Sequence, residues 1–330
     1  GRRPWLWSLL LLIGALAACE GAPTFLLPTL QPLATVPAAT VLAAQSAPLP
    51  TLPPTHTPIG PQPSQTPAPT STPRPTSTPA GCQPASQVLT GSFASAVAGE
   101  EFAYQIYLPP CYGLDGRTYP ALYLLGGNIH DETIWTTLLI DEAADRGISQ
   151  GAYPPFIIVM PDGGYPANYT SGGAGSYETL VLDELIPYIE ANYCVWGEPA
   201  GRAIGGLSRG GYWALEIAFR HADQFVSVGG HSPALLDIAA GPTLNPEYTV
   251  FNNDLGDLRL YLDIGIDDYL SGQIETWHEA IAAAGIPHIW ALNPGGHDEP
   301  YWTGNGPAYL DWYTEPWSPV RASYPACTVQ

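Results

Sequence analysis

The chain has 330 residues, of which 30 are acidic and 10 basic, so that its formal net charge is −20. All ten basic residues are arginines, and a strongly acidic chain without a basic run is poorly suited to nucleic acid or to anionic surfaces. We therefore expect no nucleic-acid partner.

Residues 1–19 have the features of a lipoprotein-type signal peptide. Arginines come first, an apolar run follows, and small residues precede Cys19. The apolar run is shorter than the roughly 20 residues that a membrane span needs. The segment Leu-Ala-Ala-Cys at 16–19 resembles a bacterial lipobox, whose cysteine carries the lipid. We expect an extracytoplasmic lipoprotein attached to the membrane only through Cys19, with ordinary secretion after cleavage near Ala17 as the alternative.

Residues 20–81 are rich in proline, threonine and serine and carry almost no charge. Such a segment cannot bury a hydrophobic core, so we expect an extended tether without a binding role. The remaining residues, 82–330, have an ordinary size for a single α/β domain.

The domain is expected to begin with an antiparallel hairpin, formed by strands at 87–93 and 101–108. Four cysteines in an exported domain favour two disulfides. Cys82 precedes the first strand and Cys111 follows the second, and these two ends of a hairpin lie side by side. We therefore predict the pairs Cys82–Cys111 and Cys194–Cys327. The metal-binding spacings C-x-x-C and H-E-x-x-H are missing from the sequence, so no metal site is expected.

The rest of the domain alternates between strands and helices. Short apolar runs predict buried strands, and periodic apolar residues predict helices. The expected strands after the hairpin are 119–125, 155–160, the run before Ser208, 225–229, 258–264 and 288–292. The expected helices are 138–147, 177–193, the segment after Ser208, 274–284 and 308–313. This alternation predicts an α/β fold with a mostly parallel sheet and helices on both faces.

The motif G-x-S-x-G spans residues 206–210 and has Ser208 at its centre. It lies between a predicted strand and a predicted helix, the context of a nucleophile elbow. Gly206 and Gly210 carry no Cβ, which allows strand and helix to approach closely around the serine. The helix N-terminus favours the negative charge that develops during acyl transfer. The motif therefore indicates a catalytic serine.

These elements and motifs resemble the "Putative esterase" family of α/β-hydrolases, which includes feruloyl and acetylxylan esterases, S-formylglutathione hydrolases and mycolyltransferases. The resemblance is strongest at residues 184–193, 202–211 and 295–302. It implies the α/β-hydrolase fold and ester chemistry without a cofactor.

A serine nucleophile needs a base, and the base needs an acid to hold it. In α/β-hydrolases the order along the chain is serine, acid, histidine. His297 lies in a glycine-containing loop after a predicted strand and corresponds to the family's G-G-H-D motif. The family's spacing from Gly265 points to Asp268 as the acid. Spacing alone leaves its neighbour Asp267 open.

An oxyanion hole needs two backbone N–H groups. One is expected from Arg209, directly after the nucleophile. The other is expected from Gly127 or Asn128, in the loop after the first buried parallel strand. Relatives usually begin this loop with His-Gly, whereas this chain has Gly126-Gly127, which leaves the choice of amide open. His130 is expected to be an ordinary loop residue, with a place in the lining of the cleft as the alternative.

Aromatic residues near these loops suggest where a substrate binds. Tyr165 and Tyr169 belong to a predicted loop, 163–177, that follows a strand end and should lie beside the nucleophile. Trp135 and Trp302 flank the oxyanion and histidine loops, and His231 follows another strand. Aromatic rings with polar tips suit sugar rings or aromatic acyl groups, although these residues are almost equally suited to packing the loops.

The sequence thus predicts an extracytoplasmic serine carboxylesterase that acts on short-chain or aromatic acyl esters of small molecules or carbohydrate. The lack of a long apolar insertion resembling a lipase lid argues against long-chain lipids. Two alternatives remain open: an acyltransferase with the same catalytic residues, and a surface binding module without catalysis. The sequence leaves the oligomeric state open.

Overall fold

The computed structural model describes residues 85–235 and 240–329. The expected signal peptide, the expected tether and the expected lipidation at Cys19 lie outside these described residues. Among the helices that are described, none combines the length and the apolar character required of a membrane span.

A single eight-stranded sheet organises the described domain, with the strand order β1-β2-β4-β3-β5-β6-β7-β8. The first two strands, β1 (Gln87–Ser95) and β2 (Glu100–Leu108), form the expected antiparallel hairpin, and β2 continues antiparallel to β4. All other neighbours are parallel. These strands are β3 (Ala121–Leu125), β4 (Ile157–Pro161), β5 (Arg202–Leu207), β6 (Ser227–His231), β7 (Arg259–Gly265) and β8 (Ile289–Asn293).

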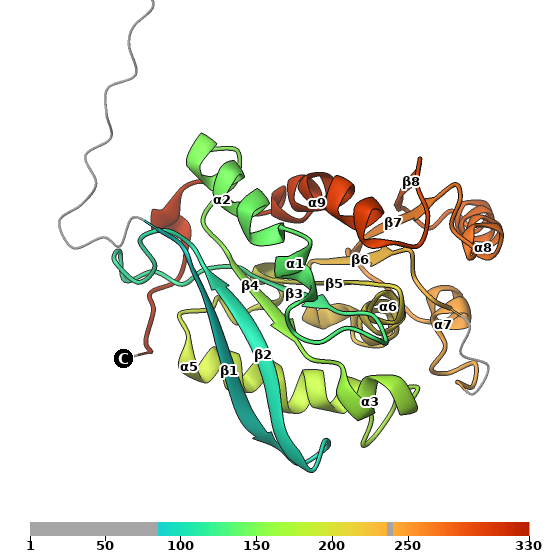
Figure 1. Ribbon diagram of the computed structural model, residues 1–330, viewed down its shortest axis with the longest axis horizontal. Coiled ribbons are helices and arrows are strands. Elements are labelled where there is room, and N and C mark those ends of the chain that lie inside the picture. The colour runs from blue at the N-terminus through green and yellow to red at the C-terminus, as the bar shows by residue number, and fades with distance from the viewer. Residues whose placement is uncertain (1–84, 236–239, 330) are drawn as a thin grey trace, which may run out of the picture. The chain divides into compact units, whose positions relative to one another are not determined.

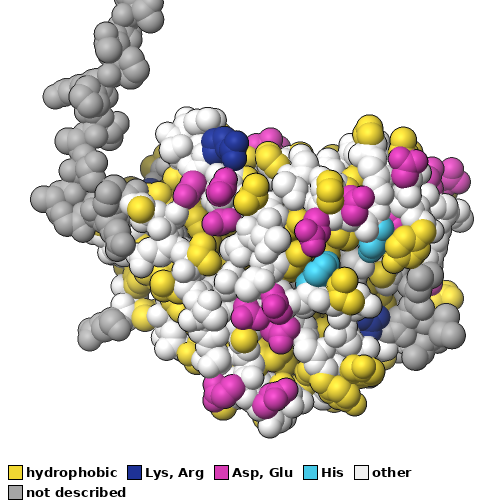
Figure 2. Space-filling view, in the orientation of Figure 1, with side chains coloured by type: hydrophobic (Ala, Val, Ile, Leu, Met, Phe, Trp, Pro, Cys, Tyr) yellow, Lys and Arg dark blue, Asp and Glu magenta, His cyan; other side chains and the backbone are white. Residues whose placement is uncertain are grey.

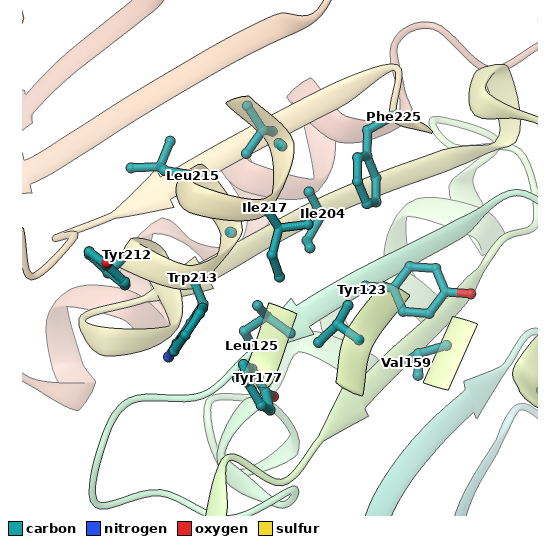
Figure 3. Packing of buried hydrophobic residues seen from close by; sticks show 14 of the residues in the cluster. Tyr123, Leu125, Val159, Tyr177, Ile204, Tyr212, Trp213, Leu215, Ile217 and Phe225 are labelled. Carbon is teal, nitrogen blue, oxygen red and sulfur yellow. The ribbon is translucent and has the colours of Figure 1, made fainter. Parts of the chain in front are cut away.

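The central strands β3, β4 and β5 are buried along their whole length because helices cover both faces of the sheet. One face packs against α1 (Ile134–Thr137), α2 (Ile140–Gln150) and α9 (Glu299–Thr314), and the other against α5 (Ile186–Asn192), α6 (Arg209–Arg220) and α8 (Ser271–Ala283) (Figure 1). In Figure 3, Leu125 and Ile204 of the sheet lie beside Trp213 and Ile217 of α6. The expected mostly parallel sheet with helices on both faces is therefore confirmed.

Two short helices were not predicted, and two predicted helices differ from the structure in detail. The expected loop 163–177 contains a short helix, α3 (Gly164–Tyr169), and an unexpected helix, α7, covers Pro246–Asn252. The expected helix over 177–193 is present, and it begins as α4 (Tyr177–Thr179), continues through a π-helical turn (Leu180–Leu185) and ends as α5. The final helix, α9, begins nine residues earlier than its apolar pattern indicates, because Asp298 caps its N-terminus by accepting from the Tyr301 N–H.

The structure contains the disulfide Cys194–Cys327, which joins the end of the chain to the segment after α5. This is the pair expected for these two cysteines. Cys111 is also disulfide-bonded, and its expected partner, Cys82, lies outside the described residues.

The final strand, β8, forms one edge of the sheet and is poorly covered, with Ile289 and Leu292 both exposed. Acidic side chains are spread over the face of the molecule shown in Figure 2, where basic side chains are sparse. The surface therefore combines an open strand edge with a large excess of negative charge.

Candidate active site

Ser208 lies at the sharp turn between β5 and α6. Its backbone has φ 54° and ψ −119°, a conformation that non-glycine residues adopt only under strain. A Cβ on Gly206 would lie 2.3 Å from the backbone of Gly210, and a Cβ on Gly210 would lie 2.3 Å from the carbonyl oxygen of Leu125. Both glycines are therefore required for β5, α6 and the end of β3 to meet around the serine.

His297 connects Ser208 to a carboxylate. It lies in the loop between β8 and α9, where its Nε2 is 2.9 Å from Ser208 Oγ and its Nδ1 is 2.8 Å from Asp268 Oδ2. Asp267 is exposed, and its backbone N–H donates to the Gly295 carbonyl, 2.9 Å away. The structure thus brings Ser208, His297 and Asp268 together in one hydrogen-bonded series, with Asp268 rather than Asp267 against the histidine.

The second oxygen of Asp268 is also occupied. Its Oδ1 accepts from the Leu270 N–H at 2.8 Å, and the side chain is buried. Burial by itself would raise the pKa of Asp268, but the hydrogen bonds from His297 and from the Leu270 N–H outweigh it, so the pKa is lowered. The carboxylate therefore stays charged at neutral pH and fixes the orientation of the imidazole.

Aromatic rings flank the imidazole of His297. The Tyr269 ring lies 4.8 Å from it and the Trp302 ring 5.0 Å, measured between ring centroids. Both rings belong to a pocket of about 490 Å³ that opens at the serine. Its lining residues are Asn128, Ile129, His130, Ser208, Tyr269, His297, Asp298, Glu299, Pro300 and Trp302. Trp302 therefore lies beside His297 in the lining of the pocket.

His130 lies in the loop after β3 and lines this pocket, which was the alternative to an ordinary loop position. Burial lowers the pKa of its imidazole, against the opposing effect of the Glu299 and Asp131 charges. Its backbone N–H donates to the Gly127 carbonyl at 3.1 Å, which closes a tight turn after β3. In the sequence, His130 follows Gly127 by three residues, and this nearness to the expected oxyanion loop is the signal for its position in the pocket.

The expected oxyanion residues lie close to the nucleophile. Arg209 is the first residue of α6, and Asn128 lines the pocket together with Ser208. A Cβ on Gly210 would lie 2.5 Å from the Gly126 carbonyl oxygen, so the loop after β3 runs directly against the elbow. The side chain of Asn168 donates to the Asn128 carbonyl at 2.9 Å and supports this loop from α3.

The segment carrying α3 is held on the helix that follows the nucleophile. Arg209 Nε and Trp213 Nε1 both donate to the Ala167 carbonyl, at 3.0 and 2.9 Å. Arg209 Nη2 donates to the Thr170 carbonyl at 2.6 Å, and the Tyr212 hydroxyl donates to the Ser171 carbonyl at 2.9 Å. The backbone of this segment is thus fixed relative to Ser208.

Tyr165 and Tyr169 project from α3 into solvent. They are 66% and 75% exposed, and their rings stack with centroids 4.9 Å apart. Neither ring lines the pocket, but Asn168, between them in sequence, donates to the carbonyl of Asn128, which does line it.

Two residues expected at the pocket lie elsewhere. Trp135 is buried under the sheet, where its Nε1 donates to the Leu125 carbonyl at 3.2 Å. His231 is fully buried, with Nδ1 2.7 Å from Asp263 Oδ1. The prediction was wrong for both: Trp135 belongs to α1 and packs in the core layer of α1, α2 and α9, and His231, at the end of β6, is hydrogen-bonded to Asp263 and to Tyr313 of α9. In the described parts of the chain, no group of three or more His, Cys, Asp or Glu side chains is arranged to hold a metal ion.

Comparisons with known proteins place the chain among esterases. The family model described as "Putative esterase" matches residues 95–307. Esterase Rv1288 of Mycobacterium tuberculosis is 30% identical over 253 residues, covering 62% of this chain and 54% of that protein. The diacylglycerol acyltransferase/mycolyltransferase Ag85A of Mycobacterium leprae is 37% identical over 145 residues, covering 39% of this chain and 41% of that protein.

Among solved structures, a ferulic acid esterase superimposes with a TM-score of 0.63 at 28% identity, covering 70% of this chain and 98% of that one. The expected α/β-hydrolase fold is thereby confirmed. The chain spans about half the length of the curated relatives it matches. Since the family model covers well over half of the 330 residues, the chain belongs to the esterase family.

Proposed function

We propose that the protein is an extracytoplasmic serine carboxylesterase that hydrolyses short-chain or aromatic acyl esters through Ser208, His297 and Asp268. The observation that carries this proposal is the series of two hydrogen bonds, 2.8 and 2.9 Å long, from Asp268 through His297 to a serine on a strained elbow. Nucleophile, base and orienting acid in hydrogen-bond reach are what acyl transfer requires.

In the first half of the reaction, Ser208 Oγ attacks the ester carbonyl carbon while His297 Nε2 takes the hydroxyl proton. The resulting oxyanion is bound by the Arg209 N–H and by an N–H of Gly127 or Asn128. Collapse of the tetrahedral intermediate breaks the bond to the alcohol oxygen, and His297 gives that oxygen the proton. The alcohol leaves, and the acyl group remains on the serine.

In the second half, water attacks the acyl-enzyme and His297 takes its proton. The second intermediate collapses, Ser208 recovers its proton from His297, and the carboxylic acid leaves. Throughout, Asp268 stabilises the protonated imidazole. These steps use only side chains, backbone N–H groups, the ester and water.

A fluorophosphonate probe tests the proposal directly, because it reacts covalently only with an activated serine. We expect the full chain to be labelled in one equivalent, at Ser208 by peptide mass spectrometry. An unlabelled protein that also fails to cleave acetyl, butyryl and feruloyl esters would leave the surface binding module as the better description.

Acyl transfer is the second candidate, because the mycolyltransferase relative is 37% identical over its matched region. An alcohol would then replace water in the second half of the reaction. Product analysis with an added alcohol distinguishes the two: free acid as the main product supports hydrolysis, and a new ester as the main product supports transfer.

We further propose that the exposed pair of Tyr165 and Tyr169 contacts the substrate outside the pocket. Stacked rings on a backbone fixed to α6 present a flat surface suited to a sugar or aromatic ring. We expect Tyr165→Ala/Tyr169→Ala to raise KM about thirtyfold for a feruloylated oligosaccharide, on the basis of about 1 kcal/mol for each of the two aromatic contacts. KM for p-nitrophenyl acetate should stay unchanged.

Tyr248→Ala is the matched control, because Tyr248 is also exposed but belongs to α7. Equal effects of Tyr248→Ala and the double variant on the oligosaccharide would remove the case for this contact. A clear preference of the unaltered protein for palmitoyl over acetyl, butyryl and feruloyl esters would contradict the proposed substrate class.

We also propose that a lipid on Cys19 attaches the protein to the cell envelope, on the basis of the signal-like segment that ends there. We expect the expressed full chain to partition with membranes and Cys19→Ser to lose the lipid mass. A mature protein that begins at another residue and carries no lipid would instead support secretion.

A further inference from the structure

A second histidine–aspartate pair lies buried behind the proposed catalytic residues. His231 ends β6 and faces Asp263 across the parallel pairing with β7. Nδ1 of His231 is 2.7 Å from Asp263 Oδ1, and both side chains are fully buried. A buried carboxylate is costly unless hydrogen bonds satisfy it, so its other partners are informative.

Those partners are tyrosines from a single helix, α9. The hydroxyls of Tyr301 and Tyr309 donate to Asp263 Oδ2, at 2.7 and 2.8 Å. The hydroxyl of Tyr313 lies 3.1 Å from His231 Nε2, and the Tyr309 ring stacks on the imidazole with centroids 3.7 Å apart. Three tyrosines on one side of α9 thus meet one histidine–aspartate pair.

The sheet is shaped to admit one of these hydroxyls. A Cβ on Gly205 of β5 would lie 1.9 Å from the Tyr313 oxygen, and a Cβ on Gly229 of β6 would lie 2.0 Å from it. Only glycine leaves this space. The close approach of α9 to the sheet therefore requires glycine at these positions of both β5 and β6.

The hydrogen bonds in this cluster have one consistent direction. Burial, and then the charge of Asp263, raise the pKa values of Tyr301, Tyr309 and Tyr313 well above their ordinary range. The tyrosines therefore remain protonated and donate. With Nδ1–H of His231 donating to Asp263, its Nε2 accepts from Tyr313. Removal of one donor would leave a buried acceptor under-satisfied, which makes the cluster resist displacement.

Each part of the cluster is connected to one member of the proposed triad. The His231 carbonyl accepts from the Ser208 N–H at 3.0 Å. Asp263 lies on β7, whose end leads directly to Asp268. Helix α9 begins two residues after His297. The three triad residues therefore stand on three elements that the cluster ties together.

We infer that Asp263, His231 and the three tyrosines are positioning residues, which set the place of His297 relative to Ser208 and Asp268 by fixing α9 against β6 and β7. This inference rests on the proposed function. It implies that loss of the tyrosine hydroxyls disturbs the chemical step more than substrate binding, because a displacement of about 1 Å in a catalytic group is enough to cost about 10²-fold in rate.

The test uses Tyr301→Phe, Tyr309→Phe and the double variant, which keep the rings and remove the hydroxyls. On p-nitrophenyl butyrate we expect kcat to fall about tenfold for each single variant and about 10²-fold for the double variant, with KM unchanged. The rate of fluorophosphonate labelling should fall in parallel. The single variants decide the question if the double variant does not fold.

Tyr153→Phe is the matched control. The Tyr153 hydroxyl donates to Asp311 Oδ1 at 2.7 Å, so it also holds α9, but on a side that does not reach β6 or β7. We expect this variant to lose stability to chemical denaturation while keeping its kcat. An equal fall in kcat for Tyr153→Phe, or an unchanged kcat for the Tyr301 and Tyr309 variants, would overturn the inference. A wild-type protein that is neither labelled nor active would instead overturn the proposed function.

Discussion

Ser208→Ala is expected to reduce kcat for p-nitrophenyl acetate by at least about 10⁴-fold, on the scale known for loss of a triad nucleophile. The substitution removes the oxygen that would form the acyl-enzyme, and no other hydroxyl is hydrogen-bonded to His297 in the described domain. The measurement is the initial rate of p-nitrophenol release, with enzyme concentration set high enough to detect residual turnover.

The same substitution should leave the fold intact. Ser208 adopts φ 54°, which alanine tolerates as well or as poorly as serine does, and its backbone hydrogen bonds to His231 and Tyr212 remain available. A wild-type-like thermal transition together with lost turnover and lost fluorophosphonate labelling supports the nucleophile. Undiminished turnover in a well-folded variant would end the proposal.

The second large effect is expected at the acid. Asp268→Asn should lower kcat by about 10⁴-fold, because an amide at this position does not stabilise the protonated imidazole and can favour the wrong tautomer of His297. The adjacent Asp267→Asn is the natural control. Asp267 is exposed, and His297 Nδ1 is hydrogen-bonded to Asp268 instead, so the rate of this variant should remain within about twofold of wild type.

The reverse order of the two rates would transfer the acid role to Asp267. Both variants replace one carboxylate by an amide of the same shape, and both remove one negative charge. The two adjacent positions differ only in their surroundings. A difference between them therefore reports the hydrogen bond to His297 rather than the overall charge of the protein.

Much of the fold could be predicted because its strands are buried on both faces. Continuous apolar runs mark β3 and β4, and the glycines around Ser208 mark the turn from β5 to α6. These signals are local in the sequence, and the residues that carry them also determine the local structure at each strand and at the turn. The hairpin was equally visible, because Phe102, Tyr104 and Ile106 alternate along its second strand.

The helix α3 gave no such signal. Its sequence, Gly-Tyr-Pro-Ala-Asn-Tyr, lacks apolar periodicity and contains glycine and proline. It is held by contacts from elsewhere in the chain, since Arg209 and Trp213, more than forty residues later, both donate to the Ala167 carbonyl. By contrast, α7 was missed despite a readable start, in which Asn245 caps the helix and Pro246 occupies its first turn.

In the site, too, residues with a local sequence signal could be predicted, and residues placed by distant contacts could not. Motif order and spacing were enough to select Ser208 and His297, and family spacing selected Asp268. The buried position of His231 could not be predicted from the sequence. Its partners Tyr309 and Tyr313 follow 78 and 82 residues later, and these contacts depend on how α9 crosses the sheet. A histidine at a strand end looks alike in sequence whether it faces a pocket or a buried aspartate.

The open edge at β8 has a consequence for the behaviour of the protein in solution. Exposed Ile289 and Leu292 beside unpaired backbone groups are a template for pairing with another strand. The net charge of −20 opposes such contact through repulsion between copies. That repulsion extends over about 30 Å at 0.01 M salt and only about 3 Å at 1 M. Ionic strength is therefore the variable that decides whether this edge meets a second copy in concentrated samples.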